Sequence, residues 1–170
     1  MRLLQHNETG EVQCVLSTEG YGAEWLDRGD IPGDVPVPLA IWEGNAIVAD
    51  LAAARLDLKA RVKALRDAAE TGGCMADGIG RFDTDPDSQR KISGAVVMAM
   101  LGGAAFSMEW RLADNSVQML DAPQMIAVGV AVGQHVAACQ FRKNDIDAQL
   151  DAAESYAALV TVDIESGWPA

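Results

Sequence analysis

The chain has few of the residues that usually build catalytic, zinc or disulfide sites. Its 170 residues include two histidines and three cysteines, and only 5% are aromatic. Cys14, Cys74 and Cys139 lie far apart and form no Cys-x-x-Cys pair, so they predict neither a disulfide framework nor a zinc site. We expect them to be small buried hydrophobic residues. With so few aromatics, Ala, Val, Leu, Met and Gly must fill the core, which favours closely approaching helices.

Positive charge is also scarce. The chain has 13 Lys and Arg against 25 Asp and Glu, a net charge of −12. Nucleic acids and anionic membrane surfaces are bound by excess basic residues, so we expect neither partner. The most apolar run, Met125 to Gly133, is far shorter than the roughly 20 residues of a membrane-spanning helix. No signal peptide is visible at the N-terminus, and we expect a soluble chain without membrane insertion.

Catalytic motifs are missing as well. The sequence contains no Gly-x-Ser-x-Gly, no His-Glu-x-x-His and no glycine-rich phosphate loop. Of the two histidines, His6 and His135, the second falls among apolar residues of a predicted helix, where we expect it to pack. The expectation is a protein that is not an enzyme and has no cofactor.

Residues 1–45 differ in composition from the rest. The alternating segment "EVQCVLS" predicts a short, half-buried strand. It is followed by "DRGDIPGDVPVPLAIW", whose prolines cannot donate backbone hydrogen bonds and favour an extended, irregular path. We therefore predict an N-terminal docking strap that lies on its own domain or on a neighbouring chain. Its candidate contact residues are Trp25, Ile31, Pro36, Pro38 and Trp42.

Residues 46–170 predict one α+β domain with three helices and two small β-hairpins, preceded by the extended Pro-rich N-terminal segment. Apolar residues at steps of three and four indicate the helices, and alternation around glycine or Asp-Asn-Ser turns indicates the hairpins. The tail after Leu159 is expected to be extended. The predicted helices cover residues 46–71, 86–101 and 122 to about 156, and the hairpins lie within 74–84 and 106–120.

Three aspartates, Asp83, Asp85 and Asp87, stand two residues apart before the second helix. A calcium loop of the EF-hand type needs Gly at position 6 and Glu at position 12, but these positions hold Ser88 and Gly94. An N-cap at Asp85 with a further acid in the first turn explains the pattern without exceptions. The aspartates remain weak candidates for a metal site, and otherwise no metal is expected.

Two further patterns mark the third helix. Asp121 and Gln124 have the spacing of a capping box at its start. Gly129 and Gly133 are four residues apart, a small-xxx-small pattern that lets another helix pack closely. The partner helix can belong to the same chain or to another subunit.

From Gly72 to Ala153 the chain resembles a known family. The matching pieces are the Thr84-Asp85-x-x-Ser88-Gln89 helix start, the hairpin "EWRLADNSVQML", the helix near His135 and the closing "DIESGWP". Together they resemble the domain of unknown function 4376 family, found in tail and tail-fibre-associated proteins of tailed bacteriophages. The family has no established catalytic residues, so the resemblance assigns none.

The resemblance implies a virion protein of the tail, made in the host cytoplasm and placed at a fibre or baseplate. It would act as a structural adaptor, with host recognition as a possible role, and would be held as a homo-oligomer beside other tail proteins. The strap and the Trp168-Pro169 end would contact those neighbours. Two alternatives stay open: an assembly chaperone for tail fibres that is absent from the virion, and a calcium-dependent glycan-binding module.

Overall fold

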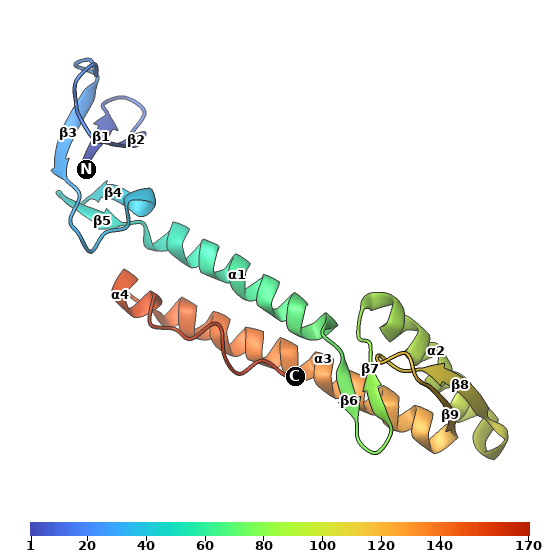
Figure 1. Ribbon diagram of the computed structural model, residues 1–170. Coiled ribbons are helices and arrows are strands. Elements are labelled where there is room, and N and C mark those ends of the chain that lie inside the picture. Colours follow the sequence, from blue (N-terminus) through green and yellow to red (C-terminus); the bar gives the residue numbers. More distant parts are fainter. The chain divides into compact units, whose positions relative to one another are not determined.

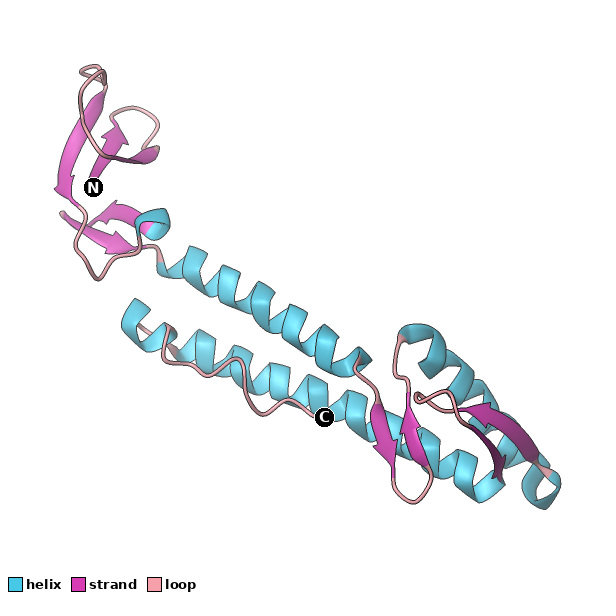
Figure 2. Ribbon diagram, viewed as in Figure 1, coloured by secondary structure: helices cyan, strands magenta, loops and turns pink.

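The computed structural model describes all 170 residues, which form an α+β protein of two compact units (Figures 1 and 2). Unit 1 comprises Met1–Lys59 and Leu150–Val162, and unit 2 comprises Ala60–Gln149 and Asp163–Ala170. The division falls inside helix α1 (Leu51–Thr71) and not after residue 45.

Unit 1 is built from short antiparallel strands. Strand β1 (Arg2–His6) lies between β2 (Val12–Val15) and β3 (Trp25–Asp30), so the expected N-terminal strand is confirmed as β2. A second hairpin joins β4 (Ala40–Glu43) to β5 (Ala46–Ala49). Its two turn residues, glycine and asparagine, both have positive φ, the conformation that matches the twist of a tight hairpin.

The N-terminal strap of the sequence analysis is not confirmed as an extended, irregular segment. Its prolines surround a short 3₁₀ turn, η1 (Val37–Leu39), which leads directly into β4. The expected start of the first helix at residue 46 is wrong, because Ala46–Ala49 pair with β4 instead. The helix starts at Leu51, after Asp50, whose carboxylate accepts a hydrogen bond from the backbone N–H of Ala53 at 2.9 Å.

Unit 2 packs two helices on two hairpins, as the sequence predicted. The hairpins and α2 lie beside the first half of α3 (Figure 1), and one apolar cluster draws residues from all of them. Fully buried members come from each layer: Phe82, Ala99, Leu120, Met125 and Val128. The elements are β6 (Cys74–Ala76) with β7 (Gly80–Phe82), α2 (Pro86–Gly102), a 3₁₀ turn η2 (Gly103–Ala105), β8 (Ser107–Arg111) with β9 (Val117–Asp121), and α3 (Ala122–Ala152).

Both predicted helix starts are confirmed in detail. Asp85 caps α2, and one of its carboxylate oxygens accepts from the backbone N–H groups of Asp87 and Ser88 at 2.9 and 3.2 Å. At α3 the capping box closes in both directions. The backbone N–H of Gln124 donates to the Asp121 carboxylate at 2.9 Å, and the backbone N–H of Asp121 donates to the Gln124 side-chain oxygen at 3.0 Å.

The end of the chain is not the extended tail that the sequence suggested. Helix α3 runs unbroken to Ala152, and a short helix α4 (Tyr156–Leu159) follows, with Ser155 as its N-cap. Beyond it, Asp163 accepts hydrogen bonds from the backbone N–H groups of Glu165 and Ser166 and bends the chain. The tail is therefore turned by local side-chain hydrogen bonds, which alternation of residue type does not reveal.

Helix α3 is long and apolar enough to cross a membrane by length and composition alone. Core helices of other proteins pass the same test. Here one face of α3 packs into the core of unit 2 through Met125, Val128 and Val132. Only 33% of the most apolar window is buried, however, so much of this apolar helix is not covered by its own chain.

Candidate functional site

The aromatic residues expected to dock on neighbours make contacts within unit 1. Trp25, on β3, stacks edge-on against His6 and Tyr21, with ring centroids 5.1 and 5.6 Å apart. Trp42, on β4, lies under the guanidinium of Arg28, whose central carbon is 4.6 Å from the ring centroid. Both tryptophans are half-buried, so these interactions help hold the small sheets of unit 1 together.

The other three strap residues are also engaged locally. The backbone N–H of Ile31 donates to the carbonyl of Met1 at 2.8 Å, continuing the β1–β3 ladder. Pro36 is the N-cap of the η1 turn, and Pro38 sits inside that turn. These two prolines set the backbone path into β4, because the proline ring restricts φ to the value that the turn requires.

Unit 1 also contains an open groove of about 800 Å³ between the strap, β5 and α4. Apolar side chains form much of its wall, and the acidic side chains of Asp34, Glu43 and Glu154 contribute to its lining. Its apolar lining includes Val35, Ile47, Val48, Leu51, Tyr156 and Val160. This groove is an open apolar surface of unit 1, and Leu16 and Leu56 are exposed outside it.

The C-terminal Trp168 is held by its own unit. Its ring N–H donates to the carbonyl of Ile164 at 3.0 Å. Arg142 of α3 donates to the carbonyls of Asp163 and Ser166 at 2.9 and 3.1 Å, which ties the tail segment to the helix. Sequence reasoning missed Arg142, because a single arginine in a helix carries no local sign of a partner more than twenty residues away.

The aspartates before α2 serve the helix start. Asp85 is the N-cap, and hydrogen bonds from the Ser88 hydroxyl and from backbone N–H groups hold the pKa of its carboxyl below the ordinary value. Asp87 pairs with Arg90 at 3.0 Å, and Asp83 is exposed. No group of three or more His, Cys, Asp or Glu side chains is gathered in the structure as a set of metal ligands.

His135 is buried on α3, as expected. Its Nε2–H donates to the carbonyl of Ala69 in α1 at 3.0 Å, which fixes that nitrogen as the protonated one.

The three cysteines are not reactive sites. The thiol of Cys139 lies one turn beyond His135 on α3, and burial raises its pKa, as it does for Cys74. A raised pKa disfavours the thiolate, so both cysteines are packing residues. Cys14 is half-buried, with its thiol 3.1 Å from the carbonyl of Val37.

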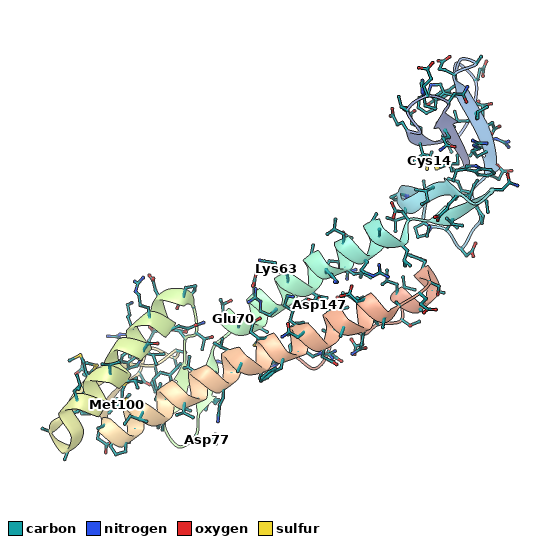
Figure 3. The ribbon with its side chains drawn as sticks, turned by 180° about the vertical axis from the view of Figure 1, so that it is seen from behind. Cys14, Lys63, Glu70, Asp77, Met100 and Asp147 are labelled. Carbon is teal, nitrogen blue, oxygen red and sulfur yellow. The ribbon has the colours of Figure 1, made fainter.

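Polar side chains join α1 to α3 within unit 2. Arg66 pairs with Glu70 at 3.2 Å, and Glu70 also accepts from the side-chain amide of Gln140. Lys143 pairs with Asp147 one turn along α3, and Figure 3 shows Glu70 and Asp147 on these two helices. The Arg66–Glu70 and Lys143–Asp147 pairs each lie within one helix, so among these contacts the hydrogen bond from Gln140 to Glu70 joins α1 to α3.

The two glycines of α3 have different surroundings. A Cβ built on Gly129 would lie 2.5 Å from a methyl carbon of Val96, so this glycine is needed for α2 to pack against α3. A Cβ on Gly133 would meet nothing within 4 Å. The small-xxx-small prediction therefore holds within the chain at Gly129, whereas Gly133 faces open space.

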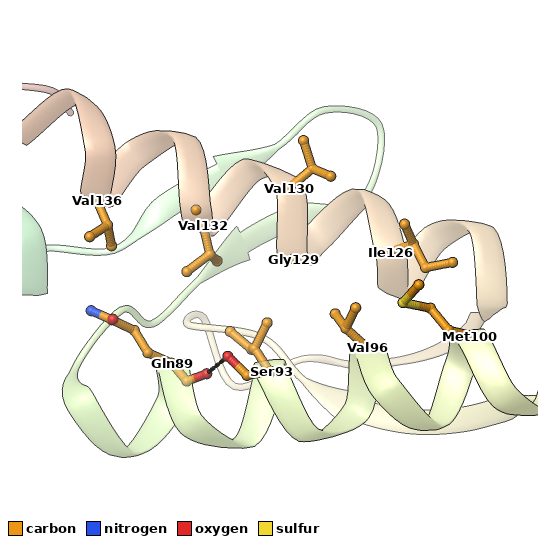
Figure 4. A pocket seen from close by; sticks show the side chains of 11 residues that line it. Gln89, Ser93, Val96, Met100, Ile126, Gly129, Val130, Val132 and Val136 are labelled. Atoms are coloured by element: carbon orange, nitrogen blue, oxygen red, sulfur yellow. Dashed lines mark hydrogen bonds between the residues drawn. The ribbon is translucent and has the colours of Figure 1, made fainter.

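Gly133 lines an open groove of about 550 Å³ between α2 and α3 (Figure 4). The figure shows the side chains of Val96 and Met100 from α2 and of Val132 and Val136 from α3 along the two walls. Polar groups occur only at one end, where the hydroxyl of Ser93 donates to the backbone carbonyl of Gln89. We call this the α2–α3 groove.

Several large apolar side chains of unit 2 are more exposed than their sequence pattern suggested. Met100 shares the helical periodicity of the buried Ile92 and Ala99 but is 68% exposed (Figure 3). Val117 and Met119 alternate along their strand, and the strand register sets them opposite Arg111 and Glu109 on the exposed face of the hairpin. Alternation shows that two faces differ but not which face is buried, so sequence reasoning could not choose between them.

Residues 53–166, more than half of the chain, match the sequence model of a family described as Domain of unknown function (DUF4376). The match contains the segment from Gly72 to Ala153, ends within the closing "DIESGWP", and includes parts of both compact units. No curated protein and no solved structure matches the chain. The chain therefore belongs to the domain of unknown function 4376 family.

Proposed function

We propose that this protein is a structural adaptor of a bacteriophage tail, associated with the tail fibre or baseplate and made in the host cytoplasm. The proposal combines the tail-protein resemblance of the sequence with one structural observation. In a chain of net charge −12, each compact unit leaves apolar grooves and large apolar side chains exposed. Uncovered apolar surface of this kind is typical of proteins that bind other proteins.

The structure changes which surfaces we assign to the neighbours. Trp25, Trp42 and Trp168 already have partners in their own units. The unit 1 groove and the α2–α3 groove are open instead, so we assign docking to them. In this proposal the chain contributes binding surfaces and no catalysis, and it works as a homo-oligomer beside other tail proteins, without nucleic acid.

Mass spectrometry of purified, salt-washed particles of the phage that encodes this chain tests the proposal. We expect peptides from the chain at a fixed ratio to the major tail proteins, and that ratio would set the copy number. Absence of the chain from particles that contain the fibre protein would refute the adaptor role. In that case, co-purification of the chain with the fibre protein before assembly would support the chaperone alternative.

A further inference from the structure

The exposed side of α3 carries a regular apolar stripe. Its residues follow one another at steps of three or four, which places them on one side of a helix, beside the α2–α3 groove. Ile126, Gly133 and Val130 line that groove, and Phe141 is 71% exposed one turn beyond Ala137. The stripe consists of Ile126, Val130, Gly133, Ala137 and Phe141.

The segments that carry the stripe and the α2–α3 groove are almost free of charged residues. Residues 122–141 of α3 contain no Asp, Glu, Lys or Arg, and neither do residues 92–108, which include the α2 wall of the groove. The whole chain nevertheless carries a net charge of −12. Two copies of so acidic a protein repel each other over most of their surface. The electrostatic repulsion is smallest when this surface of one copy contacts the same surface of the other.

Four of the five stripe residues are placed symmetrically along the chain, whereas the counterpart of Gly133 is Gln134. Ile126 and Phe141, and likewise Val130 and Ala137, are equidistant from the point between Gly133 and Gln134. A two-fold axis at that point places Ile126 of one copy against Phe141 of the other, and Val130 against Ala137. Such a contact uses one surface twice and needs no second complementary patch.

The side-chain sizes suit this arrangement. Gly133 stands at the crossing point, and the space around its Cα is open, so two helices can approach closely there. On either side of Gly133 the contact pairs Val130 of one copy with the smaller Ala137 of the other, and the larger Ile126 and Phe141 meet farther from the crossing point. We infer that two copies of this chain associate through antiparallel α3 helices that cross at Gly133, with the α2–α3 groove flanking the contact.

A lipid bilayer is the main alternative to a second copy as the partner of this apolar helix face. Insertion of α3 would remove Met125, Val128 and Val132 from the core of unit 2, where they pack against the hairpins and α2. Binding flat on a bilayer favours Lys and Arg beside the apolar face, whereas this chain is acidic. Both points favour a second copy.

Sedimentation velocity of the purified full-length chain tests the inference. We expect a monomer–dimer equilibrium that responds to protein concentration. Val130→Glu should raise the dimer dissociation constant at least about 30-fold, because the association would bury an unpaired charge. The control is Val117→Glu, the same change at a similar exposure (48%) on β9, away from both grooves, which should leave the equilibrium unchanged.

Circular dichroism at a concentration where all proteins are monomeric checks that both variants fold as the wild type does. Three results would overturn the inference: a monomer at every concentration, a dimer that tolerates Val130→Glu, or equal loss of the dimer in both variants. Flotation of the wild-type chain with phosphatidylcholine vesicles, abolished by Val130→Glu, would likewise overturn it in favour of a lipid surface.

Cysteine cross-linking tests the antiparallel orientation, in chains whose half-buried Cys14 is replaced by Ser. A mixture of Ile126→Cys and Phe141→Cys chains should form a cross-linked heterodimer with a short bis-maleimide. Ile126→Cys alone should give none, and efficient cross-linking of it alone would refute the antiparallel contact. These tests need no phage particles, so a failure of self-association would refute the homo-oligomer part of the proposed function, whereas the tail location is tested separately by the particle measurement.

Discussion

The two halves of α3 are stabilised by different interactions. Residues 122–141 carry no charge and bury Met125, Val128 and Val132 against the hairpins and α2. From Arg142 onward the helix also buries Ile146 and Leu150, but it adds ion pairs and hydrogen bonds to backbone carbonyls. Both halves are therefore sensitive to side-chain volume, and the second half is in addition sensitive to the loss of single charged or hydrogen-bonding groups.

The contacts of the second half show the same chemistry in both compact units. In unit 2, Arg142 binds two carbonyls of the C-terminal segment. In unit 1, Arg55 donates to the carbonyls of Leu150 and Ala153 at 2.9 Å each, and Lys59 pairs with Asp151 at 2.7 Å. The Leu150 carbonyl lies in the last turn of α3, where backbone carbonyls have no partner within the helix, and Arg55 supplies one.

The largest effect is expected in the first half, at Gly129. Gly129→Ala places a methyl group 2.5 Å from a Val96 methyl carbon, and separating α2 from α3 should cost about 1–3 kcal/mol of unfolding free energy. Gly133→Ala is the matched control, because its Cβ enters open space and a helical alanine should stabilise the monomer by about 0.5–1 kcal/mol. Urea unfolding at a monomeric concentration measures both, and equal effects would contradict the different surroundings of the two glycines.

A smaller, local effect is expected in the second half, at Arg142. Arg142→Ala removes the hydrogen bonds to Asp163 and Ser166 and should cost about 1–2 kcal/mol. Hydrogen–deuterium exchange should become faster in residues 163–169, while the hairpins of unit 2 keep wild-type protection. Uniformly faster exchange throughout unit 2 would show that Arg142 supports the whole core and not the tail alone. Arg142→Lys keeps the charge but not the geometry, and should restore protection only in part.

Acid should weaken the charged half first. The pKa of Asp151 is lowered mainly by its hydrogen bond with Lys59, and that of Asp163 mainly by the Ser166 hydroxyl. Because their folded-state pKa values lie below the unfolded value of about 3.9, both carboxylates stabilise the protein above that pH. This stabilisation is lost as pH falls through the folded-state values.

Thermal unfolding from pH 6 to pH 2.5 measures this dependence. Asp163→Asn should lower Tm near neutral pH, and the difference from wild type should shrink towards the acid end. A difference that stays constant over the whole range would mean that the negative charge of Asp163 does not contribute. Gly129→Ala changes no charge, so its effect on Tm should persist at every pH.

The smallest effect is expected from chelation. Asp85 uses its carboxylate to cap α2, and Asp87 is paired with Arg90. EDTA or added Ca²⁺ should therefore leave the Tm of the wild-type chain unchanged. A rise in Tm with Ca²⁺ that disappears in Asp83→Asn would restore the calcium-dependent glycan-binding alternative.

The elements of unit 2 could be predicted from the sequence because their signals are local. Apolar periodicity placed three helices, and Asp85 and the Asp121–Gln124 box set two helix starts through contacts within one turn. Glycine and Asp-Asn-Ser turns located both hairpins. The family resemblance depended on the same local pieces and is confirmed by the family match.

Only the tertiary structure decided which apolar residues are covered. Ala46–Ala49 formed a strand because β4 offers a partner for pairing, although the composition of the segment resembles a helix. Met119 and Met100 are exposed although each follows the periodicity of its element, and Val96 packs against Gly129 but not against Gly133, although the sequence pattern does not distinguish the two glycines. Sequence periodicity shows that a helix or strand has one apolar and one polar face. Which face is buried depends on the segments, distant in sequence, that pack against it.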